Sequence, residues 1–252
     1  FEFHILYSIL SHKMEVSGNF MFSWVFRIGK KITCRCLFVN CSSFFEKLED
    51  LTSHIRNHID CLPCCSNNDN ICPVEGCAHY LSSLIELQRH LHMHIFHAQR
   101  QHVGLIAVTS KTELSHLESC GFPASSKLVY DGTLLKCEWE GCSLFFDDVV
   151  SYADHIQSHI NILCSTDRDQ HLLYSCAWSG CKMTFRNKSN LRSHVRHHSG
   201  DKSTACPFCG TFFSNNSKLF NHMVRKISST DTNAGEPSGV ACHFCQKNFD
   251  SE

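Results

Sequence analysis

The sequence predicts a series of small ββα modules joined by linkers, without one large core. The chain has 252 residues, of which 18 are Cys and 19 are His, far more than a packed domain needs. These Cys and His residues recur together at a fixed spacing, with apolar residues at fixed positions between them. Modules of about 25–30 residues bury too little apolar surface to fold alone, so we expect each to need a metal ion.

The clearest repeat lies between Cys176 and Lys226, where two units follow each other. The first has the spacing Cys-x4-Cys-x12-His-x3-His, and the second has Cys-x2-Cys-x12-His. Two thiolates followed by two imidazoles one helical turn apart are typical of a Cys2His2 zinc finger. The apolar positions are Phe185 and Leu191 in the first unit, and Phe213 and Leu219 in the second.

Three further units have the complete spacing, so the sequence predicts four complete Zn²⁺ sites. The ligands are Cys36, Cys41, His54 and His58; Cys72, Cys77, His90 and His94; Cys137, Cys142, His155 and His159; and Cys176, Cys181, His194 and His198. Because His at i and i+4 share one helix face, each unit should be a hairpin carrying the Cys pair, followed by a helix. Four protein ligands leave no open coordination position, which favours structural over catalytic zinc.

The fifth and sixth units are incomplete. The fifth offers Cys206, Cys209 and His222, and no His follows at the expected place. Its fourth ligand could be water, a more distant group, or nothing. Cys242 and Cys245 begin a sixth unit that is truncated at the end of the chain.

These units define the expected domain organisation. We expect residues 1–33 to be a disordered or wrongly assigned leader, with zinc fingers at 34–60, 70–98, 135–161, 174–198 and 204–226, and a truncated sixth at 240–252. A spacer at 99–134 separates fingers 2 and 3, and a helix through Val108 could prolong finger 2. Six cysteines lie outside the repeat, among them Cys120. His97 is expected to be solvated or to face phosphate.

The charge distribution favours a nucleic acid partner. The chain has 23 Lys and Arg against 24 Asp and Glu, whereas residues 176–226 carry nine basic residues against Asp201 alone, a local charge of +8. No run of 18 apolar residues occurs, so no membrane span is expected. Cys pairs followed by His pairs favour metal over disulfides, and therefore a reducing compartment.

The residues also argue against an enzyme. A catalytic zinc site needs an open coordination position and a nearby Glu, and the His-x-Glu and Cys-x-x-Cys signature of zinc deaminases does not occur. We therefore expect no small-molecule substrate.

Positions −1, 3 and 6 of a finger helix face the bases of double-stranded DNA. Asn can pair with adenine and Lys with guanine, so fingers 4 and 5, with the truncated sixth, are expected to read bases. The predicted base-reading residues are Asn187, Asn190, Ser193, Asn215, Lys218 and Asn221; the predicted phosphate contacts are Arg186, Arg196 and Lys202. Finger 3 presents Asp148 and Asp154 at such positions, so fingers 1 to 3 are expected to support the others or to bind proteins.

Fingers 3 and 4 carry Trp139 and Trp178 two residues after their first Cys. This arrangement resembles the paired Cys-x-Trp fingers of the Gli and Zic proteins. The resemblance implies that the two fingers pack through their tryptophans, whereas the alternative is two separate surface aromatics.

A wider resemblance covers roughly residues 34–252. The run Cys176-Ala-Trp-Ser-Gly-Cys181, the segment Asn215-Asn-Ser-Lys-Leu-Phe-Asn-His222, the unusual fifth finger and the long spacer together resemble the histone H4 transcription factor family of Cys2His2 proteins. This implies a nuclear, sequence-specific activator of histone H4 genes at the G1/S transition, with a coactivator partner. Two alternatives are an array of protein-binding fingers and an RNA-binding array.

Overall fold

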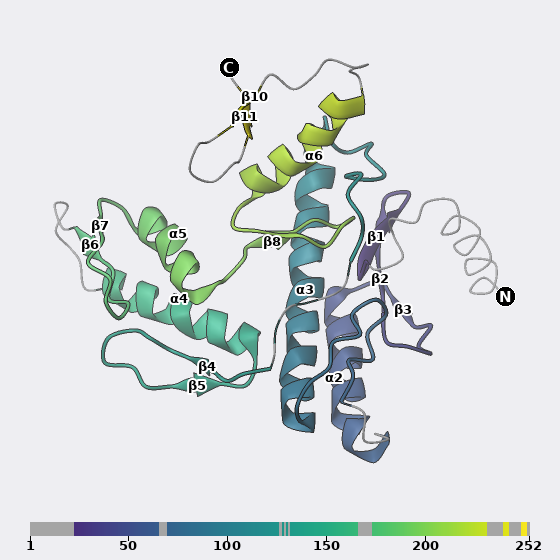
Figure 1. Cartoon of the computed structure of the whole chain (residues 1–252), viewed down its shortest axis with the longest axis horizontal. Helices are drawn as coiled ribbons and strands as arrows, with labels where there is room; N and C mark the ends of the chain where they lie inside the picture. Colours follow the sequence, from purple (N-terminus) through teal and green to yellow (C-terminus); the bar gives the residue numbers. More distant parts are fainter. Residues whose placement is uncertain are drawn as a thin grey trace.

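The predicted ββα modules are present in the computed structural model. It describes residues 23–65, 70–125, 128, 130, 132–165, 173–230, 239–241 and 248–250. Short antiparallel hairpins alternate with helices along the chain (Figure 1). Finger 1 comprises β2 (Lys31–Arg35), β3 (Phe44–Phe45) and α2 (Leu48–Cys65). In finger 2 a single bridge between Ile71 and Tyr80 takes the place of the hairpin, before α3 (Leu84–Ser110).

The later fingers repeat this plan. Finger 3 comprises β4 (Leu135–Lys136), β5 (Phe145–Phe146) and α4 (Val149–Ser165). Finger 4 comprises β6 (Tyr174–Ser175), β7 (Thr184–Phe185) and α5 (Lys188–Ser199), and finger 5 comprises β8 (Thr204–Ala205), β9 (Phe212–Phe213) and α6 (Asn216–Thr230). Strands β10 (Gly239–Ala241) and β11 (Asn248–Asp250) pair in the region of finger 6. Cys242 and Cys245 lie outside the described residues.

In fingers 1 to 4, the loop between the Cys pair needs a left-handed residue just before the second Cys. Gly76, Gly141 and Gly180 fill this position with φ between 75° and 77°, and Asn40 fills it in finger 1 with φ of 64°. Gly and Asn adopt this conformation at the lowest cost, so the loop can turn the second thiol back toward the first.

The N-terminal segment is part of the fold from residue 23 onward, which differs from the expected leader. Strand β1 (Val25–Ile28) pairs with β2 and extends the finger 1 hairpin to three strands. Trp24 is fully buried, and its backbone N–H donates to Gln101 Oε1 at 3.1 Å. The apolar stretch around Trp24 is therefore buried against the fingers, a favourable use of apolar surface that the finger spacing does not reveal. Residues 1–22 lie outside the described part of the chain.

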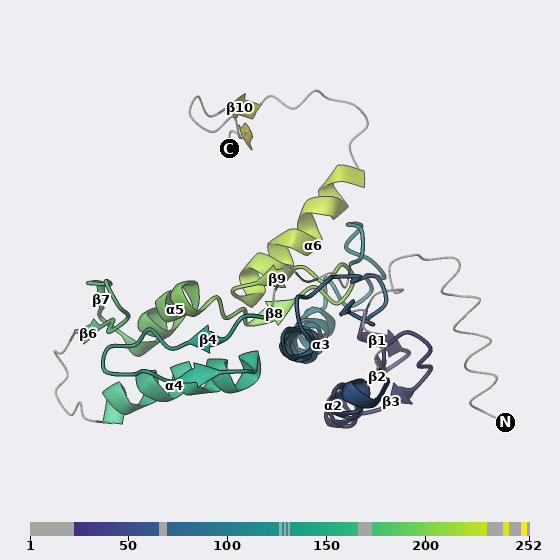
Figure 2. The same ribbon diagram turned by 60° about the horizontal axis from the view of Figure 1, so that its bottom comes forward.

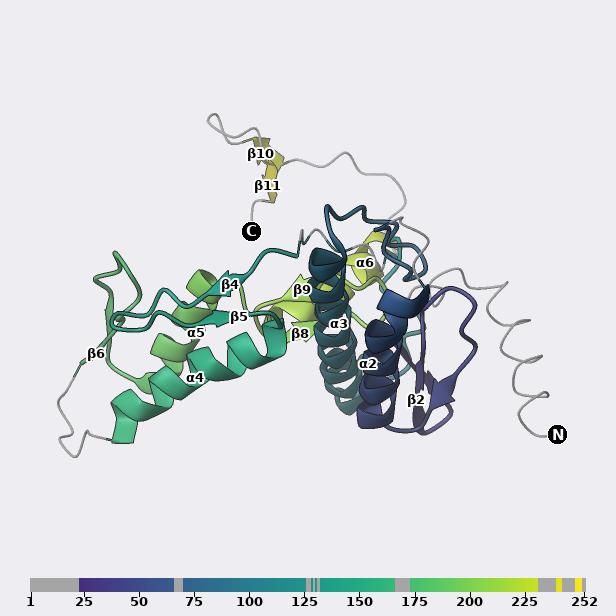
Figure 3. The ribbon, with the colours of Figure 1, turned by 90° about the horizontal axis from the view of Figure 1, so that it is seen from below.

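Helix α3 is the central element of the molecule. Its 27 residues continue from finger 2 into the expected spacer as far as Ser110, as the sequence allowed. Figures 1 and 3 show α2 beside it, with α4 and α5 on its other side. Figure 2 shows β8 and β9 of finger 5 beside α3 on the side away from α2, and α3 contacts both β8 and α6. Among the described helices, none has the length and apolar character needed to cross a membrane.

In the described part of the chain, three buried clusters take the place of a single large core. The first joins β1, finger 1 and finger 2. The second joins the end of α3, the start of the spacer and finger 5, and the third joins fingers 3 and 4. Each cluster therefore joins residues from different fingers, or from a finger and a segment outside the repeat.

Candidate metal centres and nucleic-acid interface

The ligands predicted for the four complete fingers come together in space. In each set, one candidate atom from each residue lies within 4.8 Å of the others. In finger 2, Cys72 Sγ lies 3.3 Å from His94 Nε2, and Cys77 Sγ lies 3.4 Å from His90 Nε2. Zinc bonds of about 2.0–2.3 Å in a tetrahedron put donor atoms about 3.5 Å apart, so these sets fit Zn²⁺. Bound there, the ion supplies a fixed link between hairpin and helix.

Aromatic side chains hold the first His of each site in place. Phe146 packs on His155, and Phe185 packs on His194, each with ring centroids 4.7 Å apart. In finger 2, His90 is oriented through its second ring nitrogen, since Nδ1 lies 2.7 Å from the carbonyl oxygen of Tyr130. Such a partner leaves Nε2 directed at the metal.

Burial sets the protonation of the ligands in the metal-free protein. It raises the pKa of the Cys36 thiol to about 12, and those of Cys137 and Cys176 to about 11. Zinc binds thiolates, so its binding here must release protons. Burial lowers the pKa of His54 and His194, which keeps their rings in the neutral form that binds zinc.

Finger 5 obtains a fourth candidate ligand from outside its own sequence. Cys120, in the spacer, lies beside Cys206, Cys209 and His222, again with all four ligand atoms within 4.8 Å of one another. The sequence identified Cys120 only as a cysteine outside the repeat. Because it belongs to a distant segment, no ligand spacing within a finger could have found it.

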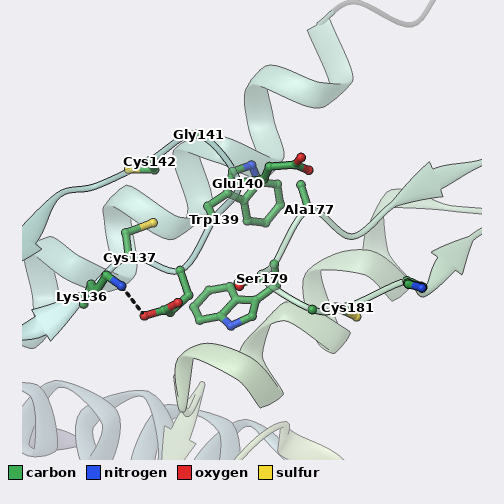
Figure 4. A pocket seen from close by; sticks show the side chains of 13 residues that line it. Lys136, Cys137, Trp139, Glu140, Gly141, Cys142, Ala177, Ser179 and Cys181 are labelled. Carbon is green, nitrogen blue, oxygen red and sulfur yellow. Dashed lines mark ion pairs between the residues drawn. The ribbon is translucent and has the colours of Figure 1, made fainter.

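Fingers 3 and 4 pack through the loops that carry their tryptophans, as their resemblance to paired fingers implies. Figure 4 shows these two loops facing each other across a pocket that both of them line. The backbones of Trp139 and Trp178 pair in antiparallel fashion, and the Glu140 N–H donates to the Ala177 carbonyl at 2.7 Å. Trp139 is buried and stacks on the zinc ligand His159, with ring centroids 5.1 Å apart.

Fingers 1 and 2 form the same kind of pair, which the sequence did not predict. Phe38 and Val74 occupy the positions of the two tryptophans, and their backbones also pair in antiparallel fashion. The Glu75 N–H donates to the Leu37 carbonyl at 2.7 Å, and Phe38 stacks on His58 with centroids 4.4 Å apart. The available signal was an apolar residue two positions after the first Cys in both fingers.

The exposed faces of α5 and α6 carry most of the predicted base-reading residues. Asn190, Ser193, Lys218 and Asn221 are exposed. Asn187 and Asn215 are exposed too, but each also caps its helix. The Asn187 Oδ1 accepts from the Asn190 N–H at 2.8 Å, and the Asn215 Oδ1 accepts from the Lys218 N–H at 2.9 Å. Capping occupies one lone pair of these oxygens, so both amides are less free for paired contacts to adenine.

The three predicted phosphate contacts differ in their surroundings. Arg186 is exposed and Lys202 is partly exposed. Arg196 instead forms an ion pair with Asp201, with its Nε 3.3 Å from Oδ2. Asp201 also pairs with Arg100 of α3 at 3.5 Å and is only 8% exposed. The link between fingers 4 and 5 is thus anchored to finger 2, and Arg196 is the least available of the three.

The family model for C2H2-type zinc fingers matches residues 174–198 and 204–225. The chain contains C2H2 zinc fingers. The first match ends at the ligand His198, whereas the second ends one residue before Lys226, where the other fingers have their second His. The family model therefore covers finger 5 without a second His ligand.

Two curated relatives carry the name of the family that the sequence resembles. The human "Histone H4 transcription factor" is 28% identical over 232 residues, which cover 86% of this chain and 43% of the relative. The bovine protein of the same name is 30% identical over 172 residues, which cover 66% of this chain and 31% of the relative. The chain thus spans less than half the length of either protein. A solved structure of the histone demethylase REF6 aligns over 67% of this chain and 96% of its own, at 23% identity and a TM-score of 0.10.

Proposed function

We propose that this chain binds double-stranded DNA at specific sequences and regulates transcription in the nucleus. The observation that carries the proposal is the pair of exposed polar helix faces on α5 and α6. Asn190 and Lys218 offer the donors and acceptors that distinguish bases, within a segment of charge +8. The positive charge attracts the phosphate backbone, and the exposed polar residues supply discrimination between bases.

The target genes follow from the two relatives. Since both are named as histone H4 transcription factors, we infer that this chain contributes to activation of histone H4 genes. The family resemblance in the sequence extends the proposal to the G1/S transition and a coactivator partner. The zinc sites serve this role as structural centres, because each complete finger uses four protein ligands. The protein therefore acts by binding rather than by catalysis.

The fingers divide the work unequally in this proposal. Fingers 4 and 5 read bases, while fingers 1 to 3 support them. In finger 3 the carboxylate of Asp148 caps α4, since its Oδ1 accepts from the Val150 N–H at 2.8 Å. The neighbouring Asp147 pairs with Arg89 of α3 at 2.7 Å. Such acidic positions repel phosphate and favour contacts within the protein.

Selection of bound duplexes from a random library, with the full chain and zinc present, tests the proposal. We expect enrichment of one compact motif, as separate finger helices read adjacent bases. If the chain retained duplexes without enriching any motif, the basic segment would bind only the phosphate backbone. Preferential competition by folded RNA would favour an RNA-binding array, and a lack of salt-sensitive binding would favour protein contacts.

Two substitutions separate base reading from phosphate contact. Asn190→Ala should relax the preference at one base pair and cost about 1–3 kcal/mol on the selected site only. Arg186→Ala should weaken binding to every duplex and reduce the slope of log Kobs against log salt by about 1. Titrations of selected and scrambled duplexes at several salt concentrations measure both effects. Equal losses on both duplexes for Asn190→Ala would exclude a base-reading role for this residue.

A further inference from the structure

Finger 5 cannot complete a zinc site from its own helix. The residue one helical turn after His222 is Lys226, whose ammonium group has no lone pair to donate. Three protein ligands alone would leave an open position, as in catalytic zinc sites. The structure instead supplies a third sulfur from the spacer.

Cys120 is placed and buried like a ligand. It is 1% exposed, and the cysteines of the finger, Cys206 and Cys209, are 0% and 4% exposed. Its candidate ligand atom lies within 4.8 Å of those of Cys206, Cys209 and His222. Three thiolates and one imidazole are an established donor set for structural zinc.

The spacer around Cys120 is held against the finger on several sides. Phe122 stacks on His222 with ring centroids 4.6 Å apart, and the Ser125 N–H donates to the Cys209 carbonyl at 3.3 Å. Leu114 is buried in the same cluster as Leu219 of α6. Cys120 is therefore brought to the site by packing on both sides of it, and its position does not depend on the thiol alone.

The opposite flank of finger 5 is packed on α3. At Gly104, strand β8 approaches helix α3 so closely that a Cβ on this residue would lie 1.9 Å from the Ala205 carbonyl oxygen. His97 Nε2 lies 2.8 Å from the Gly210 carbonyl, and Gln101 Nε2 donates to the Cys206 carbonyl at 3.3 Å. Finger 5 is thus enclosed between α3 and the spacer that follows it.

We propose that Cys120 is the fourth zinc ligand of finger 5, which makes this site a Cys3His clasp between the spacer and the finger. The ion closes a loop from the end of α3 to finger 5 and so fixes the orientation of α6 relative to finger 2. The angle between fingers 4 and 5 then depends on α3 as well as on their short linker.

Zinc content of the full chain tests the clasp. Native mass spectrometry should show one zinc ion fewer in Cys120→Ala than in the parent chain. Cys34→Ala is the matched control, because Cys34 is equally buried and belongs to none of the metal clusters among the described residues. It should retain every ion. Cys120→His replaces one zinc ligand by another and should restore the lost ion.

Cobalt substitution identifies the ligand directly. Co²⁺ bound to the parent chain should show thiolate-to-cobalt charge-transfer absorption from the five clusters among the described residues, and Cys120→Ala should lose the part that belongs to finger 5. An unchanged zinc count together with an unchanged cobalt spectrum in Cys120→Ala would overturn the proposal and assign the fourth position to water or another group. Loss of further ions that Cys120→His does not restore would also overturn it, because the thiol would then serve packing alone.

Discussion

At the scale of single residues, the sequence predicted the Cys and His sets that cluster in space, but not the polar residues that join the fingers. His97 was expected to be solvated or to face phosphate, yet it is 1% exposed and its ring contacts the Gly210 carbonyl. Burial lowers its pKa to about 4, so the ring is neutral at pH 7 and can donate this hydrogen bond. Ligand spacing cannot identify such residues, because it does not say which other face of a helix meets a second finger.

Gln101 connects three segments and provides a test at this scale. Its side chain accepts from the Trp24 N–H and donates to the Cys206 carbonyl. Gln101→Met keeps the shape but leaves the buried Trp24 N–H unpaired, at about 1–3 kcal/mol, while the Cys206 carbonyl still accepts from the Gly210 N–H. Chemical denaturation should show a corresponding fall in the free energy of unfolding. Gln99→Met, on a partly exposed position of α3, should change stability little, and equal effects of the two substitutions would contradict the assigned contacts.

At the scale of elements, the loop between the Cys pair does more than position ligands. In fingers 3 and 4 these loops pair by backbone hydrogen bonds, and in fingers 1 and 2 they do the same. Trp139 and Trp178 predicted the pairing of fingers 3 and 4, since a large aromatic side chain on a small module is stabilised by burial against a neighbour. Phe38 and Val74 gave no comparable signal, because single apolar residues at such positions are common on protein surfaces.

Removal of Trp139 should separate fingers 3 and 4. Trp139→Ala deletes a buried aromatic side chain and should cost about 3–5 kcal/mol of stability. Hydrogen exchange should then become faster at the amides of Glu140 and Ser179, which donate across the interface. Phe145→Ala is the control, as Phe145 lies in the same finger and is 58% exposed. Unchanged protection of both amides would show that the loops pair without the tryptophan.

At the scale of the whole molecule, α3 turns a row of fingers into one packed assembly. It contacts finger 1 through α2, finger 3 through α4, and finger 5 through β8 and α6. The ion pairs Arg89–Asp147 and Arg100–Asp201 add links from α3 to finger 3 and to the linker after finger 4. These contacts therefore fix the orientations of the fingers relative to α3.

The sites should lose zinc in an order set by their burial. All four ligands of finger 2 are buried, whereas His198 of finger 4 is exposed. A chelator can reach the ion only as ligands become accessible, so finger 4 should release zinc well before finger 2. Alkylation of the freed thiols after addition of EDTA, followed by peptide mapping, should label Cys176 and Cys181 first. Earlier labelling of Cys72 and Cys77 would contradict this order, and a sample without EDTA controls for thiols that are reactive in the loaded protein.

By itself, the sequence determined the module: four Cys2His2 sets that cluster in space, the hairpin and helix that carry them, and their apolar residues. These features are local, because chain connectivity places ligands only a few residues or one helical turn apart. The tertiary structure alone decided that fingers 1 and 2 also pair, that residues from 23 onward join finger 1, and that Cys120 reaches finger 5. Such contacts join segments far apart in the chain, and they depend on which helix faces pack together, which ligand spacing within a finger does not encode.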